Sequence, residues 1–228
     1  MYGLETPESD TDIRGVFLNT DPAKILGLGR NEILKAGGED SLLFELCHFL
    51  KSLLKTNTQA IELLFARQYE EIAPEFQKIR ENRLRLIDSK KLFSSLKGYI
   101  HNEMRLANGE RTGSVGSKRK SHIEKYGFSP KNFSHLFRLA YCGAVFFRTS
   151  FYPVNLSEYD PIMRDFVFSV KTEPEKYGKD QLNDVAGEIM ARLEYDFENR
   201  IQNFTFDIDF ANHLCLEFYL PFLQGGQE

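Results

Sequence analysis

Apolar residues recur at helical spacing through most of the chain, and extended patterns are confined to its first fifth. Residues 12–18 predict one strand. Residues 41–44 predict a second short strand, unless Asp40 or Ser41 instead caps the helix that follows. From Glu45 onward the apolar positions recur every three or four residues, which predicts a helix: Leu46, Phe49, Leu50, Leu53 and Leu54.

The rest of the chain predicts helices joined by short turns. A helix follows Asn57 or Thr58, either of which can cap it. Ser129 and Pro130 predict a helix start, because Ser is a common N-cap and Pro is common at the first helical position. Residues 108–121 are rich in Gly and Ser and predict a connector. The remaining helical stretches are residues 68–107 with a break at Asp88-Ser89, 130–141, 160–169, 179–202 and 209–220, the last ending before Pro221.

The composition is that of an ordinary globular protein. Of the 228 residues, 42% are hydrophobic and 27% are charged, and the net charge of -4 argues against a general polyanion binder. The chain has 20 Phe, 10 Tyr and no Trp, and we expect these aromatic side chains to pack in the core. Three scattered cysteines suggest neither a zinc site nor a disulfide framework. With no apolar span or signal peptide visible, we expect a cytoplasmic protein that does not enter membranes.

Two aspartates one residue apart, Asp10 and Asp12, are the first candidates for chemistry. In a strand they share a face, about 7 Å apart, and their mutual repulsion favours a bound cation such as Mg²⁺. Taken alone, Ser9-Asp10-x-Asp12 is weak evidence for a metal site, because Ser and Asp are also common turn formers.

The longer stretch resembles the signature Y-G-x-x-T-P-x-S-D-x-D-x-R-G of a family of predicted nucleotidyltransferases in the DNA polymerase beta superfamily. The matched residues are Tyr2, Gly3, Thr6, Pro7, Ser9, Asp10, Asp12, Arg14 and Gly15. The resemblance implies that Asp10 and Asp12 bind two catalytic Mg²⁺ ions. It also implies a third carboxylate from a neighbouring strand, for which Asp40 is our choice and Glu39 the adjacent competitor.

A basic region lies in the second half of the chain. From Arg111 to Arg138 there are seven Lys or Arg residues and one acid, and Lys131, His135 and Arg138 share one helix face. Such a face is often only solvated, but it can also bind phosphate. The block resembles the family's second signature, K-Y-G-x-x-x-K-x-x-x-H-L-x-R-L. This resemblance implies that Lys125, Lys131, His135 and Arg138 bind the nucleotide phosphates.

The resemblance implies an α+β fold: a polymerase-beta-like core with a short mixed sheet over residues 1–75, then a mainly helical domain over 76–228 with the basic loop and helix at 111–141. It implies transfer of a nucleoside monophosphate from an NTP to a hydroxyl of RNA, DNA, a protein or a small molecule. The family's Gly-Ser pair, which precedes the Tyr-Gly pair, is absent before Tyr2. The alternative is therefore a truncated, non-catalytic member that acts as a binding or regulatory protein. A third interpretation is a nucleic-acid binder that uses only the 111–138 patch.

Overall fold

The computed structural model describes residues 2–5, 13–26, 33–34, 41–110 and 117–225. The chain divides into two compact units, each assembled from segments far apart in the sequence. The sheet unit comprises Thr6–Ser89 and Phe204–Glu228, and the helical unit comprises Met1–Glu5 and Lys90–Asn203. This division differs from the expected boundary after residue 75, because the last helix packs in the sheet unit against α2.

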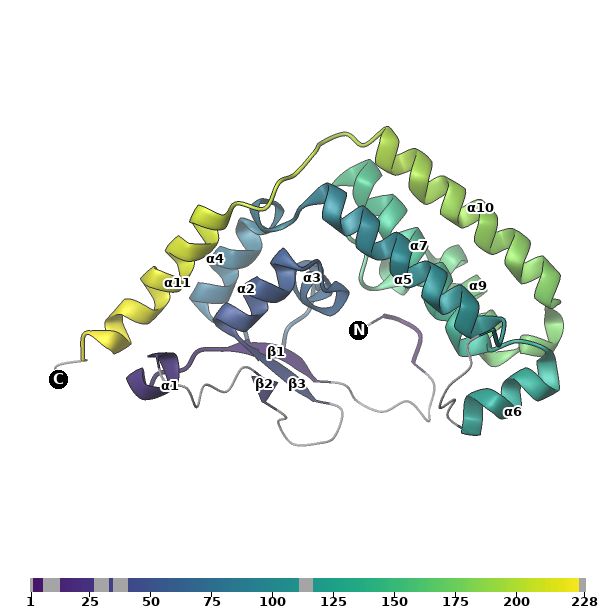
Figure 1. The fold of residues 1–228 in the computed structure, drawn as a ribbon, viewed down its shortest axis with the longest axis horizontal. Helices are drawn as coiled ribbons and strands as arrows, with labels where there is room; N and C mark the ends of the chain where they lie inside the picture. The colour runs from purple at the N-terminus through teal and green to yellow at the C-terminus, as the bar shows by residue number, and fades with distance from the viewer. Residues whose placement is uncertain (1, 6–12, 27–32, 35–40, 111–116, 226–228) are drawn as a thin grey trace. The chain divides into compact units, whose positions relative to one another are not determined.

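Within the described residues, three short strands form a mixed sheet in the order β1-β3-β2 (Figure 1). β1 (Arg14–Phe17) and β3 (Leu42–Glu45) run parallel, and β2 (Ile33–Leu34) is antiparallel to β3. The expected α+β class is confirmed at this level, since helices make up most of the other described residues.

The helices predicted from the apolar spacing after β3 are present. α2 (Leu46–Leu54) follows β3 directly and packs on β1 and β3 (Figure 1). Its cap is Glu45, whose carboxylate accepts a hydrogen bond from the His48 amide at 3.1 Å. The predicted strand at 41–44 is therefore present, shifted by one residue to Leu42–Glu45. α3 (Thr58–Phe65) is capped by Asn57, whose side chain accepts from the Ala60 amide at 3.1 Å.

The sheet unit is completed by shorter helices and by the last helix of the chain. Their bounds are α1 (Pro22–Leu26), α4 (Pro74–Glu81), the 3-10 helix η1 (Arg83–Leu86) and α11 (Ile208–Leu223). The segment before α11 is fixed by a hydrogen bond of 2.8 Å from the Asp207 amide to the Arg85 carbonyl. The expected end before Pro221 was wrong: α11 continues three residues further, to Leu223, because in the last turn the missing amide removes only one helical bond.

The helical unit consists of long helices around α7 (Figure 1). α7 packs against α9 and α10. The bounds of the elements are α5 (Ser89–Ala107), α6 (Ser117–Tyr126), α7 (Pro130–Thr149), α8 (Leu156–Tyr159), α9 (Pro161–Thr172), η2 (Pro174–Lys176) and α10 (Lys179–Glu198).

Several boundaries differ from the predictions. The expected 68–107 stretch is interrupted because residues 66–73 are not helical and Pro74 starts a new helix. The connector at 108–121 ends early, since α6 begins at Ser117. α7 runs straight through Gly143, where a Cβ would lie 2.7 Å from Leu96 and 3.1 Å from Leu193. This glycine therefore permits close helix packing and does not mark a turn.

The aromatic side chains pack as expected in the interior. In the helical unit five aromatic residues are at most 1% exposed: Phe128, Phe133, Phe137, Phe146 and Tyr152. Burying each such ring contributes about 1.5–3 kcal/mol to the stability of the fold. The first four lie on or next to α7, so the helix that carries the basic residues is also the centre of this core.

Candidate active site

The acids implied by the resemblance lie just before the described strands. Four predicted site residues fall outside the described part of the chain: Ser9, Asp10, Asp12 and Asp40. Arg14, the other matched residue near them, is the first residue of β1 and is half-buried. Its guanidinium donates to the carbonyl of Ile13 at 3.3 Å, so this arginine lies along the edge where the strand begins.

The two strands next to these acids have a definite register. Arg14 pairs with Leu42 in the parallel ladder, and the Leu42 amide donates to the Ile13 carbonyl at 2.8 Å. In the sequence, Asp12 stands two positions before one member of this pair, and Asp40 stands two positions before the other.

The start of α7 is fixed by a chain of buried polar contacts. Ser129 holds the expected cap position, but its hydroxyl donates to the Asn132 side chain at 2.7 Å and caps no amide. Asn132 in turn donates to the carboxylate of Glu103 on α5 at 2.7 Å. Each of these three residues is at most 6% exposed, so the contacts set where α7 begins.

Along the predicted basic face of α7, the solvent exposure of the side chains decreases from the start of the helix inward. Lys131 is exposed, His135 is half-buried, and Arg138 is only 3% exposed. Burial, together with the positive charges of Arg138 and Lys131, lowers the pKa of His135 to about 3. The Tyr99 ring also meets the imidazole edge to face, with 5.6 Å between ring centroids. At neutral pH His135 is therefore an uncharged imidazole.

The first residues of the chain lie on this helix. The Arg138 guanidinium stacks over the Tyr2 ring at 3.9 Å from its centroid, a cation–π contact. The Tyr2 carbonyl accepts from the Leu156 amide at 3.2 Å. The first residue of one signature thus contacts a basic residue of the other, within a single unit.

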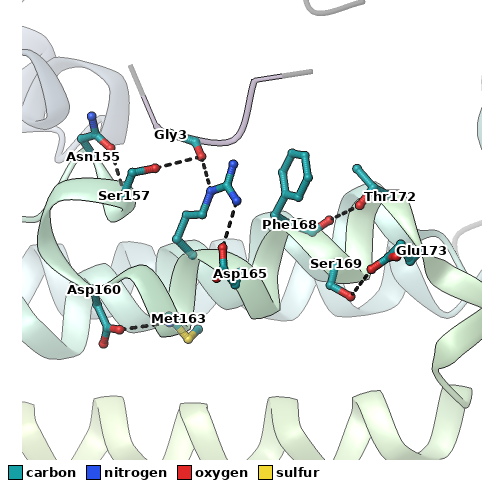
Figure 2. A network of polar contacts seen from close by, with 11 residues as sticks. Gly3, Asn155, Ser157, Asp160, Met163, Asp165, Phe168, Ser169, Thr172 and Glu173 are labelled. Carbon is teal, nitrogen blue, oxygen red and sulfur yellow. Dashed lines mark hydrogen bonds and ion pairs between the residues drawn. The ribbon is translucent and has the colours of Figure 1, made fainter. Parts of the chain in front are cut away.

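Gly3 holds the segment on α8 and α9 (Figure 2). Its carbonyl accepts from Arg164 at 2.7 Å and from the Ser157 hydroxyl at 3.2 Å. Its φ of +70° favours glycine, and a Cβ would lie 2.1 Å from the Ser157 oxygen. The Lys171 ammonium also donates to the Leu4 carbonyl at 3.2 Å. The glycine of the signature is thus required here by backbone conformation and by space.

Lys125 is not on α7 with the other three basic residues. It lies on the preceding helix, α6, and is exposed. A hydrogen bond with Tyr126 raises the pKa of Lys125, whose ammonium lies 4.7 Å from the centre of that ring. Among the described charges, only Arg138 and Lys131 lower the pKa of His135. The structure therefore groups Lys131, His135 and Arg138 and leaves Lys125 separate from their electrostatics.

Sequence reasoning missed the residues that support this site. Neither Glu103 nor Arg164 was singled out from the sequence, yet Glu103 is 6% exposed and Arg164 binds the Gly3 carbonyl. Glu103 stands four residues before Ala107, whose carbonyl accepts from the Ser129 amide at 2.8 Å. No local pattern distinguishes such a carboxylate, because its partner Asn132 lies on α7, 29 positions later in the chain.

Comparison with known proteins gives no relative. No protein-family model matches the chain, and neither does any curated protein or solved structure. Within the described ranges, no three His, Cys, Asp or Glu side chains form a group that could hold a metal ion. Among the helices of those ranges, none is both long and apolar enough to cross a membrane.

Proposed function

We propose that the protein is a metal-dependent nucleotidyltransferase that transfers a nucleoside monophosphate from an NTP to an acceptor hydroxyl. Asp10, Asp12 and Asp40 are its proposed metal ligands. The observation that carries this proposal, beyond the resemblance of residues 2–15, is the parallel register in which Arg14 pairs with Leu42.

If this register extends by two residues, it pairs Asp12 with Asp40. Paired residues of neighbouring strands point to the same face and lie about 4.8 Å apart. In such an extended strand Asp10 would share that face through the two-residue period. Three carboxylates so arranged would repel one another strongly, and oxygen ligands of this kind suit Mg²⁺. A donor set in this register would therefore suit a magnesium site.

Two Mg²⁺ ions bound by these carboxylates would supply the positive charge that activates an acceptor hydroxyl and stabilises departing pyrophosphate. The protein's own part is to hold the carboxylates in register and to bind phosphate. Among the basic residues, exposed Lys125 and Lys131 are the proposed phosphate ligands. His135 is neutral and can only donate or accept a hydrogen bond, and Arg138 positions Tyr2.

The acids can be tested without knowing the acceptor. Mn²⁺ binding in the presence of each NTP would be followed by electron paramagnetic resonance, and pyrophosphate release would be measured with candidate RNA, DNA and small-molecule acceptors. Asp12→Asn and Asp40→Asn should each weaken Mn²⁺ binding by more than about 100-fold, since removing a ligand should exceed the effect of losing an outer-shell partner. Glu39→Gln is the matched control and should leave binding unchanged.

Unaltered Mn²⁺ affinity in both aspartate variants would exclude the proposed metal site. Weakened binding in Glu39→Gln alone would instead move the third ligand from Asp40 to Glu39. Both results are measured as Mn²⁺ affinity, so neither depends on finding the right acceptor.

One observation favours the alternative, a non-catalytic binding or regulatory protein. Arg138 is covered by the Tyr2 ring and His135 is uncharged. The α7 face therefore presents less positive charge to a ligand than the sequence predicted. Such a protein would bind NTP through Lys131 without releasing pyrophosphate. NTP binding that is lost in Lys131→Ala, together with intact binding and no turnover in Asp12→Asn and wild type, would favour this alternative.

A further inference from the structure

We propose that Cys47 and Cys215 form a reversible disulfide when the protein meets a peroxide. Their sulfur atoms lie 3.3 Å apart, although 168 positions separate them in the sequence. Cys47 is the second residue of α2, and Cys215 lies in the middle of α11. Both belong to the sheet unit.

Two contacts of α11 with earlier parts of the sheet unit, at the cap of α2 and on α4, hold this helix in place near the thiols. The Tyr219 hydroxyl on α11 donates to the carboxylate of Glu45, the residue that caps α2. Glu217 on α11 pairs with the Lys78 ammonium at 2.6 Å. A sulfur–sulfur bond is about 2.05 Å long, so the thiols need to approach by only about 1.3 Å. Rotation of two side chains can supply that movement while the helices stay in place.

The thiols differ from the third cysteine in access to solvent. Cys47 and Cys215 are both partly exposed, so an oxidant can reach them. Cys142 is buried in α7 and its thiol donates to the Pro153 carbonyl at 3.1 Å. Susceptibility to oxidation follows exposure as well as thiolate character. The chain therefore contains its own unreactive control.

The reaction needs one equivalent of hydrogen peroxide. The thiolate of one cysteine attacks a peroxide oxygen, the O–O bond breaks, and a sulfenic acid and hydroxide form. The second thiolate then attacks the sulfenic sulfur; the S–S bond forms, the S–O bond breaks, and hydroxide leaves. The two thiol protons combine with the two hydroxide ions to give two molecules of water. Two electrons pass from the sulfurs to peroxide, and a dithiol reductant reverses the change by exchange.

The disulfide would fasten the last helix to the helix that follows β3. Crosslinking positions so far apart restricts the unfolded chain strongly, so the thermal midpoint of unfolding should rise, by about 5–10 °C. Exchange of the α11 amides with solvent should slow, because this helix could no longer detach from α2.

The test uses the full chain, reduced and then treated with one equivalent of hydrogen peroxide. Peptide mass spectrometry should find a Cys47–Cys215 link, a mass loss of about 2 Da and one remaining thiol, at Cys142. Cys142→Ser should keep the link, whereas Cys47→Ser and Cys215→Ser should lose it together with the rise in midpoint. Dithiothreitol should restore the reduced midpoint.

Two results would overturn this assignment. One is oxidation of wild type to sulfinic acids or to dimers linked between molecules, without the internal bond. The other is an internal bond that includes Cys142. Because wild type and Cys142→Ser both retain the proposed pair, a folding defect in the other variants cannot obscure the outcome.

Discussion

Acid should destabilise the folded chain through His135. Its pKa is about 3 in the folded state, because the imidazole is buried beside Arg138 and Lys131. In the unfolded chain its pKa returns to about 6.5. Below pH 6.5 the unfolded state therefore binds a proton at this imidazole, whereas the folded state does not. Unfolding is then favoured increasingly as the pH falls from 6.5 towards 3, and the effect vanishes above 6.5.

The magnitude follows from the two pKa values. At pH 5.0 the unfolded imidazole is almost fully protonated and the folded one is almost fully neutral. Between pH 6.5 and 5.0, an interval of about 1.5 pH units, the unfolded state therefore binds up to one proton more than the folded state. At 1.36 kcal/mol per unit this is a loss of about 2 kcal/mol relative to pH 7.5. His135→Gln cannot titrate, so it should lack this part of the pH dependence.

Urea unfolding followed by circular dichroism at pH 7.5 and 5.0 would measure the difference. Wild type should lose about 2 kcal/mol more than His135→Gln over this interval. His101→Gln, which alters an exposed imidazole on α5, is the control and should keep the wild-type slope. Equal slopes in wild type and His135→Gln, or an NMR titration of the His135 ring with a midpoint near 6.5, would refute the reasoning.

Two further predictions concern packing. Tyr219→Phe should destabilise the sheet unit by about 1.5–3 kcal/mol in urea unfolding, because it removes a donor to the buried Glu45 carboxylate; no change would mean that this hydrogen bond contributes nothing. Gly143→Ala should cost about 1–3 kcal/mol, because its Cβ would lie 2.7 Å from Leu96. Gly187→Ala, on an open face of α10, should instead raise stability by about 0.5–1 kcal/mol, and a rise in both variants would contradict the packing argument.

Local patterns predicted the elements that depend on local chemistry. The apolar spacing predicted α2, and Asn57 proved to be the cap of α3. The same approach failed where distant contacts override local preference. The predicted helix ended at residue 141, but α7 continues to Thr149 and packs closely against α5 and α10 at Gly143. Residues 117–121 looked too polar to order, yet they begin α6.

The division into units was also beyond sequence reasoning. α11 packs in the sheet unit through partners such as Lys78 and Glu45, which lie more than 130 positions earlier. Spacing along the chain carries no information about which helix returns to the sheet. For the same reason, the shared face of Lys131, His135 and Arg138 was predictable from helical periodicity, whereas the Tyr2 ring over Arg138 was not.

Asp40 and Glu39 are equally good magnesium ligands as isolated residues, so their chemistry cannot distinguish them. Strand geometry can, because adjacent side chains point to opposite faces. If the observed parallel register extended by two residues it would pair Asp40 with Asp12, and extension by a third residue would pair Glu39 with Thr11. Only Asp40 would then share a face with both Asp10 and Asp12. A ladder of four paired residues thus favours one of two neighbouring acids as the third ligand, and the paired variants Asp40→Asn and Glu39→Gln measure that preference directly.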